Sequence, residues 1–100
     1  MNNNESIFKA LSDPNRREIL RLLRKHTMSA GEIATHFTLA KSTLSSHFNI
    51  LKKSGLIQEE RNRTTIYYSL NLSVAEEALA AVMDLLGTGE KTFRPDKEDK

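Results

Sequence analysis

One segment of the sequence, residues 39–56, combines short hydrogen-bonding and basic side chains with an apolar stripe. At about 100° per residue of helix, Leu44, Phe48 and Leu51 fall within about 60° of one another. Serine and asparagine compete for backbone groups in mid-helix, so a run of them on an exposed face needs a reason other than stability. Contacts with base edges and phosphates are such a reason, and the segment predicts a helix that lies in a DNA groove. The polar side carries Ser42, Ser45, Ser46, Asn49, Lys52 and Lys53.

Residues that could support catalysis or metal binding are few. The sequence contains no cysteine, which excludes disulfides and thiolate metal sites. His26, His36 and His47 do not share the short helical spacing that a pair of metal ligands uses. We interpret His26 and His36 as structural or exposed, while His47 either bonds a phosphate or braces its helix. No nucleophile elbow, glycine-rich phosphate loop or framed pair of carboxylates is present, so we predict neither an enzyme nor a cofactor.

The formal net charge of +2 is unevenly distributed along the chain. Residues 1–71 hold eleven Lys and Arg against six Asp and Glu, a balance of +5, while residues 72–100 hold four against seven, a balance of −3. A basic main body with a pI of about 9.0 is typical of a nucleic-acid-binding protein. No signal peptide and no apolar run long enough to span a bilayer is recognisable, so we expect a soluble, cytoplasmic protein.

Local signals predict two helices at the start of the chain. A short apolar helical turn spans residues 6–11, and Asp13 followed by Pro14 is a helix start, with the aspartate as N-cap and the proline at the first helical position. The second helix should run to about Lys25, because its apolar residues keep helical spacing and basic residues lie at its C-terminal end.

Two further helices should follow, joined by a short turn. Ser29 and Glu32 have the spacing of a capping box at the start of a short third helix. Residues 38–40 form the turn, and the serine-rich helix continues to Ser54. Gly55 then ends it, as glycine commonly does at helix C-termini.

The remaining elements are a hairpin and a closing helix. Residues 65–70 are rich in β-branched and aromatic side chains and predict a strand, with a hairpin tip at residues 62–64. The order α-α-α-α-β-β-α predicts a mainly α fold with a small β-hairpin, the winged helix-turn-helix. Arg61 and Arg63 flank the tip of this wing and are either DNA contacts or solvated charges. One domain should span residues 1–86.

The last predicted helix, residues 73–86, carries an apolar arc of about 200°, twice what packing on one core requires. One half can cover the domain and the other half a second copy of the chain, although the arc could also be plain alanine-rich surface. Residues 87–100 have too little apolar content to pack and are expected to be a mobile tail. The predicted homodimer interface, formed by the terminal helices, comprises Ile7, Phe8, Leu11, Leu79, Val82, Met83 and Leu86.

From Phe8 to Asn71 the chain resembles the ArsR family of bacterial winged-helix repressors. The matching segments are ALSDPNRREIL, AGEIATHF, STLSSHFNILKKSGLI and IYYSLN, in that order. The RREIL and IYYSLN segments resemble the SdpR-like autorepressor branch. The resemblance implies a sequence-specific, autoregulatory transcriptional repressor that binds an inverted-repeat operator as a homodimer and is released by an inducing signal.

The metal-sensing relatives use cysteines near the third helix, or histidines with carboxylates on the last helix, and this chain has neither set, so we expect a metal-independent repressor. Its expected partners are double-stranded DNA and a second copy of the chain. A membrane protein or another protein partner is one candidate for the inducing signal. The competing hypothesis is a winged-helix adaptor or antitoxin-like module, which would lack the basic surroundings of the serine-rich helix. The predicted DNA-binding residues are Lys41, Ser42, Thr43, Ser45, Ser46, His47, Asn49, Lys52, Arg61 and Arg63.

Overall fold

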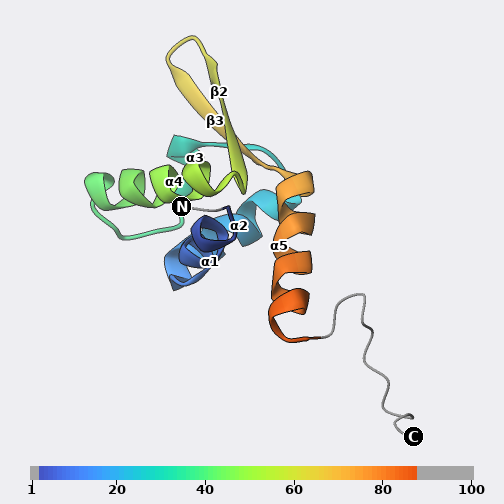
Figure 1. The fold of residues 1–100 in the computed structure, drawn as a ribbon. Coiled ribbons are helices and arrows are strands. Elements are labelled where there is room, and N and C mark those ends of the chain that lie inside the picture. Colours follow the sequence, from blue (N-terminus) through green and yellow to red (C-terminus); the bar gives the residue numbers. More distant parts are fainter. Residues whose placement is uncertain (1–2, 88–100) are drawn as a thin grey trace, which may run out of the picture.

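A computed structural model describes residues 3–87 and confirms a mainly helical fold with a small antiparallel sheet. The hairpin of β2 and β3 stands out from the helices, and α5 runs along one edge of the helical body (Figure 1). The tail expected from residue 87 onward lies, after Gly87, outside the described residues. The elements are α1 (Asn3–Leu11), α2 (Pro14–Lys25), β1 (Met28–Ser29), α3 (Ala30–Ala34), α4 (Lys41–Ser54), β2 (Ile57–Asn62), β3 (Thr65–Leu70) and α5 (Leu72–Leu85).

The predicted helix caps are confirmed. The Asp13 carboxylate accepts hydrogen bonds from the backbone amides of Asn15, at 2.7 Å, and Arg16, at 3.2 Å. Ser29 and Glu32 bond reciprocally as a capping box, at 3.0 and 2.8 Å. Gly55 ends α4 in the left-handed conformation, with φ of 85°. These caps use amides and carbonyls that a helix end would otherwise leave unpaired.

The sheet has a third strand that we did not predict from the sequence. β1 pairs antiparallel with β3, Met28 opposite Tyr68, so the strand order is β1-β3-β2. Two residues are too few to show the period-2 alternation of a strand. The closing helix also begins one residue earlier than predicted, because the Asn71 side chain accepts from the amide of Val74 and caps it.

The core lies where α1, α2 and α4 meet the base of the hairpin. Ile7, Ile19, Ile33 and Leu51 are fully buried within it. The Phe48 ring of α4 stacks on a β3 tyrosine with ring centroids 4.5 Å apart, which holds the helix against the wing. In residues 3–87 we find no helix with the length and apolar character needed to cross a membrane.

Candidate nucleic-acid interface

Helix α4 has the two faces that its sequence predicts. Leu44, Phe48 and Leu51 are buried against the body. The side chains that were expected to read DNA remain exposed on the other face, which makes α4 a helix anchored by apolar residues and open to a ligand along its length. The exposed polar residues are Ser42, Thr43, Ser45, Ser46 and Asn49.

The start of α4 is open to an anion. Its N-cap is Ala40, whose side chain makes no capping hydrogen bond, so the first amides of the helix are not covered by a side chain. Unpaired amides and the positive end of the helix dipole attract phosphate groups. Lys41 is exposed at the first helical position and adds a full positive charge there.

Lys52, at the other end of α4, connects the helix to the wing. Its ammonium lies 2.6 Å from a carboxylate oxygen of Glu59 on β2. This hydrogen bond raises the pKa of Lys52, while burial opposes the rise. The pKa of Tyr68, beside them on β3, is raised by burial and by the negative charge of Glu59. Lys52 thus shares its charge with Glu59 and braces the hairpin, which distinguishes it from exposed Lys53.

The wing offers two long cations near its free end. Arg61 and Arg63 are exposed, and neither forms an ion pair within residues 3–87. The turn consists of two residues, since Asn62 pairs with Thr65. Arg63 has a φ of 61°, a left-handed conformation that costs a non-glycine residue on the order of 1 kcal/mol. The hairpin projects beyond the helices, so these charges lie away from the core (Figure 1).

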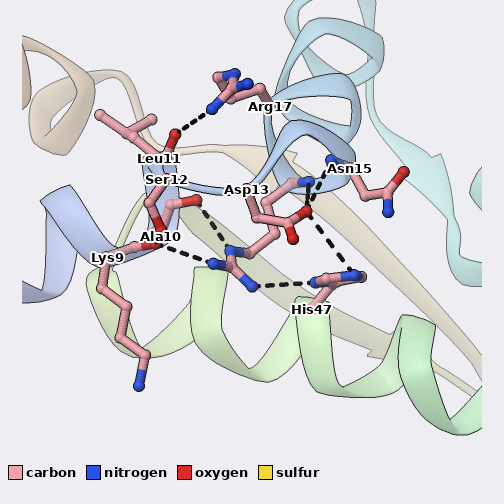
Figure 2. A network of polar contacts seen from close by, with 9 residues as sticks. Lys9, Ala10, Leu11, Ser12, Asp13, Asn15, Arg17 and His47 are labelled. Carbon is pink, nitrogen blue, oxygen red and sulfur yellow. Dashed lines mark hydrogen bonds and ion pairs between the residues drawn. The ribbon is translucent and has the colours of Figure 1, made fainter.

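His47 lies on the buried side of α4, with 8% of its surface exposed. Its Nδ1 is 3.1 Å from an Nη1 of Arg16, and its Nε2 is 4.0 Å from the Asp13 carboxylate. Figure 2 shows this ring pointing toward the start of α2. Of the two roles considered for His47, bracing fits this geometry. His26 and His36 are exposed, as interpreted from the sequence.

Arg16 is the functional candidate that sequence reasoning missed. It is only 7% exposed and lies on the same stripe of α2 as Ile19 and Leu23. Arg16 stands three residues before Ile19 and seven before Leu23, so all three lie on the core-facing side of the helix. This spacing in the sequence could have identified Arg16 as a buried residue. Such a residue needs partners for its charge.

The carboxylate of Asp13 completes this cluster. Burial alone would raise the pKa of Asp13, but the backbone amides of Arg16 and Asn15 donate to the carboxylate. Together with the nearby His47 and Arg16 side chains, they lower its pKa below the ordinary value of 3.8. The ionised carboxylate is therefore stabilised at the start of α2, where the helix dipole also favours negative charge.

Helix α5 presents an apolar surface that the protomer does not cover. Ala78 packs against the domain, whereas Leu79 is 61% exposed. Leu72 and Leu85, which we did not predict as interface residues, are also exposed. Ile7, which we expected in the interface, is fully buried in the protomer's own core, while Phe8 and Leu11 are half-buried. The large exposed apolar side chains of α5 and its C-cap are Leu72, Leu79, Met83, Leu85 and Leu86.

Comparisons with known proteins agree with this arrangement. A family profile described as "Bacterial regulatory protein, arsR family" matches residues 13–59. The chain is 43% identical over 90 residues to the transcriptional repressor SdpR of Bacillus subtilis, a match that spans 90% of this chain and 97% of that protein. Its fold is similar to a solved ArsR-like transcriptional regulator from Rhodococcus, with a TM-score of 0.73, 28% identity and coverage of 86% and 80% of the two chains. The transcriptional repressor BigR from Xylella fastidiosa is similar at a TM-score of 0.63 and 27% identity, covering 81% and 83%.

Proposed function

Because the chain belongs to the ArsR family of bacterial regulatory proteins, we propose that it represses transcription as a homodimer on an inverted-repeat operator, without a metal ion. The family consists of DNA-binding transcription regulators and not of enzymes. SdpR and BigR are both described as transcriptional repressors, which favours repression over activation here. Binding to the chromosome would place the protein in the cytoplasm.

The observation that carries the proposal is the two-faced α4. Leu44, Phe48 and Leu51 are buried. On the opposite face, beside an uncapped helix start and Lys41, the exposed side chains are Ser42, Ser45, Ser46 and Asn49. In winged helix-turn-helix proteins the second helix of the pair enters the major groove, where short polar side chains reach base edges. Ser46 and Asn49 are our proposed base contacts, and Lys41 our proposed phosphate contact. An adaptor module would have no need for this polar, positively flanked face.

The wing is proposed to add contacts with the DNA backbone. Arg61 and Arg63 lie at the end of a projecting two-stranded hairpin, where both side chains are exposed and make no ion pair within residues 3–87. Such cations increase affinity for DNA of any sequence by releasing counterions from phosphates.

The second copy is proposed to pack on α5. A helix of 14 residues with four large exposed apolar side chains, and a fifth at its C-cap Leu86, is unusual on the surface of a monomer. A two-fold interface there would pair two recognition helices for two half-sites about one DNA turn, roughly 34 Å, apart.

Metal independence is proposed from ligand chemistry. The sequence has no cysteine, and α5 contains no histidine, so the nitrogen and sulfur donors that bind transition metals tightly are missing from that helix. Its acidic residues are Glu76, Glu77 and Asp84, and oxygen donors alone suit harder cations.

Titration of a fluorescent duplex from the chain's own upstream region tests the proposal. We expect tight binding to that duplex. At the same salt concentration, the affinity for a scrambled duplex of equal length should be lower by about a thousandfold or more. Equal affinity for both duplexes would favour the adaptor hypothesis. Repeating the titration with micromolar zinc should leave the operator affinity unchanged, and release by stoichiometric zinc would contradict metal independence.

A further inference from the structure

A buried arginine joins three elements of the fold at one point. Arg16, in the first turn of α2, donates from Nε to the carbonyl of Ala10 and from Nη2 to the carbonyl of Lys9, both at 3.0 Å. Both carbonyls belong to the last turn of α1, where the helical amides run out. The Lys9 carbonyl also accepts from the amide and the hydroxyl of Ser12, at 3.2 and 2.7 Å. The remaining Nη1 lies 3.1 Å from Nδ1 of His47 on α4. The contacts around Asp13 and His47 are drawn in Figure 2.

The chemistry of this contact defines the state of the imidazole. A guanidinium can only donate hydrogen bonds, so Nδ1 of His47 must accept and carry no proton. The ring proton is then on Nε2, which faces Oδ1 of Asp13 at 4.0 Å. The charged groups around the ring are thus Arg16 and Asp13, both at the start of α2, while α1 contributes only backbone carbonyls to this cluster.

Directional bonds at this point constrain α4 in a way that its apolar contacts do not. Leu44, Phe48 and Leu51 hold the helix against the core, but apolar contacts are non-directional and tolerate small rotations and shifts. His47 follows Ser46 directly and precedes Asn49 by two residues. A constraint on its ring therefore fixes the rotation of α4 about its axis, and with it the direction in which the Ser46 and Asn49 side chains point. Base recognition needs that precision, because a binding group displaced by more than about 0.5 Å loses its geometry.

We propose that Arg16 is a positioning residue for DNA recognition, which sets the rotation of α4 relative to α1 through the acceptor nitrogen of His47. This inference rests on the proposed function, because it concerns how α4 discriminates between DNA sequences. Arg16 also connects α1 to α4 by a chain of hydrogen bonds, and α1 packs against both α4 and α5. The ordinary alternative is that Arg16 only caps the end of α1.

A matched set of variants separates the two roles. His47→Leu removes the acceptor and keeps an apolar side chain of similar size, whereas His47→Asn restores an acceptor, since an asparagine carbonyl occupies the place of Nδ1. Arg17 provides the control for capping alone, because it donates to the carbonyl of Leu11, at 2.8 Å, and within residues 3–87 it does not hydrogen-bond to α4. The measured quantity is the ratio of affinities for the upstream duplex and a scrambled duplex, at a temperature where circular dichroism shows every variant folded.

We expect His47→Leu to lower this ratio by about tenfold or more, which corresponds to about 1.4 kcal/mol, and His47→Asn to retain most of it. Arg16→Lys should lower the ratio as well, since one ammonium cannot bond two carbonyls and a ring together, while Arg17→Lys should leave it unchanged. If His47→Leu does not fold, Arg16→Lys against Arg17→Lys decides. Nitrogen chemical shifts of the wild-type ring should show the proton on Nε2 of His47.

A wild-type ratio in both His47→Leu and Arg16→Lys would overturn the positioning role, and so would a ring protonated at Nδ1. If instead the wild-type protein fails to distinguish the two duplexes, the proposed function fails, and the positioning role falls with it.

Discussion

Replacing Leu79 by Lys tests the proposed dimer surface of α5. Leu79 is 61% exposed in the protomer, and full burial of a leucine contributes about 1.5–3 kcal/mol. Covering the exposed part would thus contribute about 1–2 kcal/mol per protomer, or about 2–4 kcal/mol for both copies of a two-fold interface. A buried, unpaired ammonium adds a cost of several kcal/mol. The total exceeds about 5 kcal/mol and weakens the dimer by more than about a thousandfold.

Sedimentation of Leu79→Lys at micromolar concentration should show monomers. Its far-ultraviolet circular dichroism should match the wild-type signal, because the side chain contributes little to the protomer's own core. Its affinity for the operator duplex should fall to that for a scrambled duplex, since a single half-site remains. Asp84→Lys is the matched control: Asp84 is exposed and lies about 140° around α5 from Leu79, so this variant should stay dimeric. A Leu79→Lys protein that remains dimeric with wild-type affinity would refute the assignment of this surface.

Three further predictions concern the wing and the helix ends. Arg61→Ala should reduce the slope of log affinity against log salt by about one unit, while Lys25→Ala, a cation outside the proposed interface, should not; an unchanged slope would remove the wing from the interface. Asp13→Ala should lower the free energy of unfolding by about 1 kcal/mol at neutral pH. Because folding lowers the pKa of Asp13, its stabilisation is present above the unfolded value of 3.8 and is lost as pH falls through the folded value, so thermal unfolding should show this deficit shrinking in acid; a constant deficit would contradict the assignment. Gly55→Ala should cost about 1–2 kcal/mol, because φ is 85° and the new Cβ would lie 3.4 Å from Val74. Gly31→Ala, within α3, should be neutral or stabilising, because its new Cβ would make only an ordinary contact with the Ser29 hydroxyl, at 3.9 Å. Equal effects in chemical denaturation would argue against the left-handed cap.

Sequence signals that act within a few residues predicted this fold well. The Asp13 cap, the Ser29 capping box and the Gly55 terminus each depend on neighbours less than five residues away, and all three are confirmed. The apolar stripe of α4 likewise identified the face that is buried.

Contacts between distant residues were not predictable in the same way. Arg16 and His47 are 31 positions apart, and their hydrogen bond depends on how α2 crosses α4. The pairing of Lys52 with Glu59 requires the register between α4 and the wing. Ile7 has the same apolar character as Phe8 and Leu11, which were predicted with it for the interface, and only the packing of α1 on α4 determines that it faces inward. The two residues of β1 become a strand only because β3 lies beside them.

Sequence reading by α4 is best tested with a panel of operator duplexes that carry single base substitutions, titrated with wild-type protein, Ser46→Ala and Asn49→Ala. We predict that each variant loses discrimination at particular base pairs, by about 1–3 kcal/mol each, and keeps the wild-type preference at the others. Equal weakening on every duplex in the panel would contradict it, because α4 would then position the protein on DNA without reading the sequence.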